Sequence, residues 1–210
     1  MKTHQGDLFA ETIESENFGT YLFFDTETTG LPANWQAPMS DLENWPRLVQ
    51  IAWVLYENGA KVSQSDFIIK PEGFAIPVAS SSIHGITTEI AEKEGVLLQL
   101  VLNQFQGLVM RADFLVAHNI SFDEKIVGAE FLRKNMPNGL VAKKTICTKE
   151  ISTNFCAIPS VHGRSGYKWP KLSELHLKLF GAEFIDFHNA LADVTATAKC
   201  FWEMKKRGIM

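Results

Sequence analysis

Residues 20–30 read TYLFFDTETTG, and this stretch decides how the rest of the chain is interpreted. Its YLFF run is short, wholly apolar and rich in aromatic residues, which is typical of a strand that is buried on both faces. We expect this strand to end at Asp25. Side chains two positions apart on a strand project from the same face, so Asp25 and Glu27 can point at one spot near its end.

The acidic pair Asp25 and Glu27 is a candidate cation site. Two carboxylates directly after a buried strand repel each other and lose hydration unless a cation or hydrogen-bond donors compensate them. Mg²⁺ prefers oxygen ligands and is usually bound through a few carboxylates together with substrate phosphate. A D-x-E pair also occurs by chance in many proteins, so the alternative for the pair alone is a solvated strand end.

The remaining elements indicate an α/β fold in one compact unit. Further strands are predicted at residues 47–57, 62–70 and 114–117 and near Thr145, and helices at residues 96–110, 121–135, 171–181 and 189–206. The dipeptide Asn58-Gly59 signals a tight hairpin turn, so the first three strands should be neighbours in one sheet. A hairpin-containing sheet followed by alternating strands and helices favours an α/β layered fold. Residues 1–18 are mostly polar and are interpreted as a tail, which leaves residues 19–210 as the domain.

A second motif, AHNISFDEKIV at residues 117–127, lies where the strand FLVA meets a helix. Catalytic groups of open α/β sheets gather outside the carboxyl ends of strands, which is where Asp123 falls. The alternative for Asp123 alone is a helix amino-terminal carboxylate that interacts with the helix dipole.

A third motif, DFHNALADV, places His188 five positions before Asp193 at the start of the last helix. Ala190, Val194, Ala198 and Phe201 follow helical spacing and should pack inward, with Asp193 at the border of that stripe. A carboxylate that borders a buried face usually has a partner. For His188 alone, the alternative is a loop or capping histidine.

Taken together, the three motifs resemble the DEDDh (DnaQ-like) family of 3′–5′ exonucleases over roughly residues 20–206. That family includes the proofreading subunit of bacterial DNA polymerase III, ribonuclease T and the three-prime repair exonucleases. The resemblance implies a ribonuclease-H-like fold with a central mixed five-stranded sheet flanked by helices. It also implies release of nucleoside 5′-monophosphates from a nucleic-acid 3′ end, in DNA proofreading or repair.

The resemblance assigns roles to the motif residues. Asp25, Glu27 and Asp193 would hold the metal that activates the attacking water, and Asp25 would bridge to a second metal held with Asp123. Two Mg²⁺ ions are expected, with Mn²⁺ as a substitute, because paired cations stabilise the attacking and leaving oxygens of a displacement at phosphorus. His188 would be the general base, since an unperturbed imidazole has a pKa of about 6.5, close to working pH.

By the same resemblance, a larger set of residues would contact the terminal nucleotide: Thr26, Thr28, Thr29, Gly30, Leu31, His84, Asn119 and Phe122. Gly30 would permit close backbone approach and Leu31 would wedge against the last base. For each of them, a packing or turn role is the alternative.

Two segments depart from a minimal family member. Residues 32–46, PANWQAPMSDLENWP, form a long connection that is either a lid or base-stacking rim around Trp35 and Trp45, or a packed surface loop, which we favour. In the tail, Gln5 to Phe9 (QGDLF) resembles the short peptides that bind the bacterial sliding clamp.

Composition sets limits on partners. The formal net charge of −4 gives no global attraction for a polyanion, so any nucleic-acid face must be local; lysines and arginines exceed acidic residues between Lys143 and Lys178. Three cysteines without C-x-x-C spacing, no leader-like segment and no long apolar run predict a cytoplasmic protein with no membrane partner.

Single-stranded DNA with a free 3′ end is the favoured partner over RNA, and discrimination between the two depends on how the site treats a 2′-hydroxyl. The alternatives are an RNA-trimming exoribonuclease, a short-oligonucleotide phosphodiesterase and a non-catalytic nucleic-acid-binding module.

Overall fold

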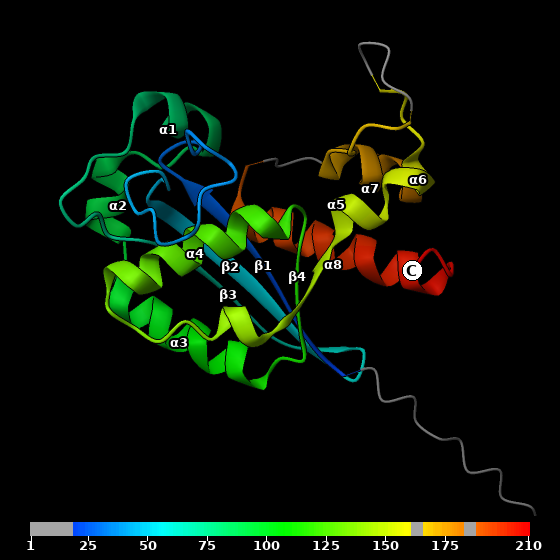
Figure 1. Ribbon diagram of the computed structural model, residues 1–210, viewed down its shortest axis with the longest axis horizontal. Coiled ribbons are helices and arrows are strands. Elements are labelled where there is room, and N and C mark those ends of the chain that lie inside the picture. The colour runs from blue at the N-terminus through cyan, green and yellow to red at the C-terminus, as the bar shows by residue number, and fades with distance from the viewer. Residues whose placement is uncertain (1–18, 161–165, 183–187) are drawn as a thin grey trace, which may run out of the picture.

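The computed structural model describes residues 19–160, 166–182 and 188–210 of the chain, which form a five-stranded sheet with helices on both faces (Figure 1). The strands are β1 (Thr20–Thr28), β2 (Leu48–Glu57), β3 (Ala60–Ile68), β4 (Phe114–Ala117) and β5 (Lys144–Cys147). Their order across the sheet is β3-β2-β1-β4-β5, with β2 antiparallel to β1 and β3, and β4 parallel to β1 and β5. The predicted α/β class and mixed five-stranded sheet are therefore confirmed.

The strand β1 is longer than the sequence predicted. It continues past Asp25 to Thr28, because β2 pairs with it along its whole length, from Thr20 opposite Glu57 to Thr28 opposite Leu48. The prediction that the strand ends at Asp25 was wrong, since polar residues stay extended where a neighbouring strand supplies hydrogen bonds. As a result, Asp25 and Glu27 lie within the sheet and not after it.

The hairpin between β2 and β3 forms as predicted. Glu57 pairs with Ala60, so Asn58 and Gly59 are the two turn residues. Their φ angles of 51° and 79° are the positive values that a type I′ turn needs at both positions.

The helices run in chain order α1 (Val78–His84), α2 (Thr88–Glu94), α3 (Leu98–Arg111), α4 (Ile120–Arg133), the 3₁₀ turn η1 (Leu140–Ala142), α5 (Thr148–Ile151), α6 (Thr153–Cys156), α7 (Leu172–Phe180) and α8 (Ala190–Lys206). The four helices predicted from periodicity correspond to α3, α4, α7 and α8. Helices α1, α2, α5 and α6 were not predicted, because none exceeds two turns and such short segments show no helical period.

Alternation along β1 divides the core between the two faces of the sheet. Leu22 and Phe24 pack with α3 and α4 on one face. Tyr21 and Phe23 pack with α8 on the other, where Ala190, Val194, Ala198 and Phe201 are buried as predicted. Because β1 contacts helices on both faces, its carboxyl end is the point where residues from α4 and α8 can meet (Figure 1).

A buried ion network fixes α4 against the start of β2. The Glu130 carboxylate has no exposed surface and accepts hydrogen bonds from Arg47 Nε at 2.8 Å, Arg133 Nη1 at 2.9 Å and the Leu48 backbone N–H at 3.0 Å. Arg47 in turn donates its backbone N–H to the Thr29 hydroxyl at 2.9 Å. The network therefore links α4, which carries Asp123, to the end of β1.

Within the described part of the chain, no helix is both long enough and apolar enough to cross a membrane.

Candidate active site

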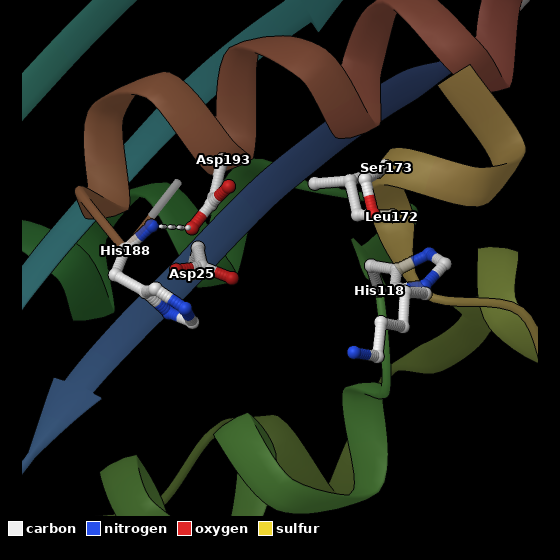
Figure 2. Close-up of a pocket in the computed structure, with 7 residues that line it drawn as sticks. Asp25, His118, Leu172, Ser173, His188 and Asp193 are labelled. Carbon is white, nitrogen blue, oxygen red and sulfur yellow. Dashed lines mark hydrogen bonds between the residues drawn. The ribbon is translucent and has the colours of Figure 1, made fainter. Parts of the chain in front are cut away.

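Three carboxylates from two distant segments converge at the end of β1. Asp25 and Glu27 lie on β1, and Asp193 lies in the first turn of α8. Each offers an oxygen that lies within 4.8 Å of the oxygens of the other two. Figure 2 shows Asp193 reaching from α8 toward Asp25. The cluster has the hard oxygen donors that a divalent cation such as Mg²⁺ takes as ligands.

A fourth carboxylate, Asp123, lies beside the cluster on the other side of β1. It occupies the first turn of α4, is only 3% exposed, and accepts a hydrogen bond from the Thr26 hydroxyl at 2.7 Å. Its charge acts on Asp25 and raises the pKa of that carboxyl group. The residues predicted as metal ligands are thus close together, with Asp123 held in place by its neighbour on the strand.

Burial and mutual repulsion disfavour ionisation of the cluster. Burial is the main cause of the raised pKa values: well above the usual range for Asp25, about 8 for Glu27, about 7 for Asp123 and about 6 for Asp193. The charges of neighbouring carboxylates raise the values for Asp25 and Glu27 further. A bound cation would relieve both penalties, because it favours the ionised form of each ligand.

His188 lies at the entrance to the cluster, directly before α8. Its φ of 64° is unusual for a residue other than glycine. Its backbone N–H donates to Asp193 Oδ2 at 3.1 Å, whereas its side chain is exposed. Figure 2 shows the imidazole close to Asp25 at one side of the cavity. The backbone bond fixes the position of the residue and leaves the ring nitrogens available.

A cavity of about 430 Å³ opens over these groups. Asp25, His188 and Asp193 form one wall, and the opposite wall contains residues that sequence reasoning did not assign to the site: His118, Leu172 and Ser173 (Figure 2). Lys171, which belongs to the stretch rich in basic residues between Lys143 and Lys178, also lines the cavity. His118 directly follows β4, at the edge of the sheet where the carboxylates lie, so its position in the sequence could have marked it as a site residue. The start of α7 gave no such signal, because only the tertiary fold brings it to this edge.

His118 connects the two segments of that wall. Its Nδ1 lies 3.0 Å from the Thr148 hydroxyl and its Nε2 lies 3.1 Å from the Pro170 carbonyl oxygen. Burial lowers the pKa of His118 to about 4, so the ring is neutral at neutral pH.

The turn after β1 is held by the hydroxyls of Thr28 and Thr29. Thr28 donates to the Gly30 carbonyl at 2.6 Å, and Thr29 accepts from the Arg47 N–H. Gly30 has a φ of 155°, and a Cβ at this position would meet no atom within 4 Å, so the backbone angle is what requires glycine. These contacts are the turn role considered as the alternative, and contact with a terminal nucleotide stays a prediction.

The other predicted contact residues differ in exposure. Leu31 is 74% exposed, whereas His84, at the end of α1, is 9% exposed and accepts from the Ile86 N–H at 3.1 Å through Nδ1. Among the described residues, the buried Nε2 of His84 has no hydrogen-bond partner. Asn119 is the N-cap of α4 with a φ of 94°, and Phe122 lies in the first turn of that helix. Their contact with substrate also stays a prediction.

The connection at residues 32–46 has one buried and one exposed tryptophan, as a packed surface loop would, and its role as a lid or base-stacking rim stays a prediction. Trp45 is 2% exposed and packs in the core, which anchors the segment, and its Nε1 donates to the Pro38 carbonyl of the same segment at 2.9 Å. Trp35 is 46% exposed, and its ring centroid lies 5.6 Å from that of Phe122. One tryptophan is therefore a packing residue and the other lies at the surface beside the second motif.

Comparison with known proteins identifies the family. The family model described as exonuclease matches residues 22–201. The chain is 32% identical over 190 residues to a PolC-type DNA polymerase III of Streptococcus thermophilus, which covers 90% of this chain and 11% of the polymerase. A PolC-type polymerase of Streptococcus agalactiae is 33% identical over 144 residues, 69% of this chain and 9% of that protein. The chain thus spans about a tenth of the length of these relatives.

Solved structures share the fold. E. coli exonuclease I in complex with a dT13 oligonucleotide matches with a TM-score of 0.71 at 21% identity, over 90% of this chain and 41% of that one. A complex of exonuclease I named ExoI/SSB-Ct matches with a TM-score of 0.68 at 19% identity, over 90% and 41% of the two chains. The resemblance of the three motifs to the exonuclease family is confirmed, and so is the fold that it implied for the chain.

Proposed function

The chain belongs to the exonuclease family, and we propose that it is a metal-dependent 3′–5′ exonuclease that releases nucleoside 5′-monophosphates from single-stranded DNA. The observation that carries the proposal is the convergence of Asp25, Glu27 and Asp193 within 4.8 Å, with Asp123 adjacent. Carboxylates with raised pKa values in one cavity have little structural use in the absence of a cation.

The donor set fits two Mg²⁺ ions, for which Mn²⁺ can substitute. Asp25, Glu27 and Asp193 would hold the ion next to the attacking water, and Asp25 with Asp123 would hold the second. When bound, the two cations supply positive charge at the attacking and leaving oxygens and lower the pKa of the water.

The chain's own residues complete the reaction. The exposed imidazole of His188 accepts a proton from the attacking water, and its backbone bond to Asp193 keeps it beside the cluster. The water oxygen forms a bond to phosphorus as the bond from phosphorus to the 3′-oxygen of the preceding nucleotide breaks. That oxygen takes a proton from solvent, and the shortened strand retains a 3′-hydroxyl.

DNA is the proposed polymer because the relatives are DNA polymerases and a fold neighbour, exonuclease I, is bound to a dT13 oligonucleotide. Residues 19–210 are proposed as the exonuclease domain. Clamp binding through Gln5–Phe9 stays a prediction, because this segment lies outside the described residues. A Leu8→Ala, Phe9→Ala double variant should lose affinity for a bacterial sliding clamp in a pull-down. Equal retention of the variant and wild type by the clamp would refute this prediction.

The test is degradation of 5′-labelled single-stranded DNA and RNA of the same sequence with Mg²⁺. A ladder that shortens one nucleotide at a time, absent with chelator and in Asp25→Asn, is the expected result for DNA. Glu203→Gln is the matched control, because Glu203 lies on the same helix as Asp193 but in its last turns, paired with Arg207. Immediate release of the labelled 5′ nucleotide, or a ladder that survives in Asp25→Asn, would overturn the proposal.

A further inference from the structure

A second cavity, of about 290 Å³, lies beside the active-site cavity. It is lined by Trp35, Gln36, Asn119, Ser121, Lys149, Glu150 and Trp169. Its two tryptophans are 46% and 61% exposed. Large exposed aromatic side chains that face one cavity are unusual on a surface that binds nothing, because apolar area in water costs free energy.

The two cavities share their walls. Residues 118–121 supply His118 to the active-site cavity and Asn119 and Ser121 to the second. Likewise, residues 169–173 supply Trp169 to the second cavity and Lys171, Leu172 and Ser173 to the first. A ligand that extends out of the active site past these segments therefore enters the second cavity next.

The second cavity also carries a cation. Lys149 Nζ lies 4.2 Å from the ring centroid of Trp169 and donates to Asn119 Oδ1. Its charge lowers the pKa of Asp123, so the ammonium group lies near that carboxylate as well as near the indole. Glu150 opposes this charge, but its side chain is exposed and is free to turn into solvent. An ammonium beside two indoles matches the phosphate and base of one nucleotide.

We propose that this cavity binds an unpaired nucleotide of the substrate strand, upstream of the one being removed. Its base stacks on Trp35 and Trp169, and its phosphate pairs with Lys149. This inference rests on the proposed function, since it names how the same site holds a polymer. Packing against Phe122 does not account for Trp35, nearly half of which is still exposed in that contact.

The test compares a substrate that reaches the second cavity with one that does not. The two substrates are dT12 and the p-nitrophenyl ester of thymidine 5′-monophosphate, which has no upstream nucleotide. Loss of base stacking should raise the KM for dT12 by about fivefold or more in Trp35→Ala and Trp169→Ala. Turnover of the ester should be unchanged. Trp35→Phe and Trp169→Phe should retain most of the affinity, because phenylalanine still stacks.

Met110→Ala is the matched control. Met110 is 64% exposed and lies at the end of α3, before the amino end of β4, which is the edge of the sheet opposite the active site. Binding of fluorescein-labelled dT12 in chelator, followed by anisotropy, repeats the comparison without cleavage. The same assay with Lys149→Ala should show a weaker dependence of affinity on salt.

The outcomes separate the two proposals. An unchanged KM and an unchanged anisotropy titration in both alanine variants would overturn the second cavity as a nucleotide site. An equal rise in KM for the p-nitrophenyl ester would also overturn it, because the effect would then lie in the active-site cavity. If wild type hydrolyses neither substrate, the proposed function fails, and the anisotropy comparison still decides whether the tryptophans bind single-stranded DNA.

Discussion

Asp25, in the middle of the sheet, and Asp193, in the first turn of the last helix, present carboxylate oxygens within 4.8 Å of each other. Each is held by structure that packs for other reasons: β1 is the central strand, and α8 buries an apolar stripe against it. Burial raises the pKa of both carboxyl groups, and the charge of Asp193 raises that of Asp25 further, so the fold keeps two buried acids close together at a cost. Sites kept at a cost to stability are typical of function.

Replacement of Asp193 by Asn should separate activity from stability. Loss of a metal ligand removes several kcal/mol of charge stabilisation, so kcat should fall at least about a thousandfold. In chelator at pH 8, the melting temperature should rise, because a repulsive charge is gone. Calorimetry and the ladder assay measure the two effects, with Glu203→Gln as control. A variant that is both inactive and less stable than wild type would contradict the account.

Stability without metal should fall as pH rises. Carboxyl groups of the unfolded chain titrate at about pH 4, whereas the pKa values of Glu27 and Asp123 in the fold are about 8 and about 7. Between those limits the folded chain binds more protons than the unfolded chain, so the free energy of unfolding decreases from about pH 4 to about pH 8.

Calorimetry in chelator over this range should show the melting temperature falling by several degrees. Excess Mg²⁺ should flatten the curve, with the largest gain at the alkaline end. Parallel curves with and without Mg²⁺ would show that the cluster does not bind the cation.

Replacement of His188 by Gln should impair catalysis and leave metal binding intact. The side chain is exposed and the hydrogen bond to Asp193 comes from the backbone N–H, so the ligand cluster keeps its geometry. Loss of a general base should lower kcat by about a hundredfold to ten-thousandfold. Titration calorimetry with Mn²⁺ should give the wild-type affinity. A large loss of Mn²⁺ affinity would make His188 a ligand-positioning residue instead of a base.

Replacement of Thr26 by Val should show what the bond to Asp123 contributes. The substitution keeps the shape of the side chain and removes the donor 2.7 Å from a buried carboxylate. Because that hydrogen bond lowers the pKa of Asp123, its loss should move the acidic limb of the pH–rate profile to higher pH. Backbone N–H groups still donate to this carboxylate, so loss of the one side-chain hydrogen bond should cost about 1 kcal/mol of stability. Thr26→Ser restores the hydroxyl, and a profile equally shifted in that variant would assign the effect to packing.

Replacement of Glu130 by Ala should destabilise the fold strongly. It leaves Arg47 and Arg133 without their shared buried partner, which typically costs about 3–5 kcal/mol. For a chain of this length, that is a fall in melting temperature of roughly 10 °C. Glu203→Ala removes only a surface ion pair and should change the melting temperature little. Equal effects of the two substitutions would refute the importance of the buried network.

Local patterns predicted much of the fold. The apolar run at β1, the Asn58-Gly59 turn and the helical stripe of α8 are features that neighbouring residues determine, and all three form as expected. The strand end was wrong at Asp25, because pairing with β2 extends β1 through polar residues. The short helices α1, α2, α5 and α6 escaped detection, since segments of one or two turns are stabilised by packing more than by their own pattern.

The candidate site was predicted from motifs that the sequence placed at strand or helix ends. Asp25, Glu27, Asp123 and Asp193 were chosen for that reason, and they lie close together in the structure. Lys149, Lys171 and Trp169 were not assigned to the cavities that they line, because those cavities depend on how the α5–α7 region folds over the edge of β4. Tertiary contact between segments distant in sequence leaves no local pattern.

The packing of α8 against β1 completes the carboxylate cluster, so the proposed nuclease activity depends on the last helix of the chain. A nascent or truncated chain that ends before His188 has two of the three motifs and all five strands of the sheet, but it lacks Asp193 and the histidine beside it. Under the proposed mechanism such a fragment lacks one metal ligand and the general base, so we expect it to be inactive. Because Asp193 lies on the last helix, the proposed activity requires that α8 has been synthesised and has packed against the sheet.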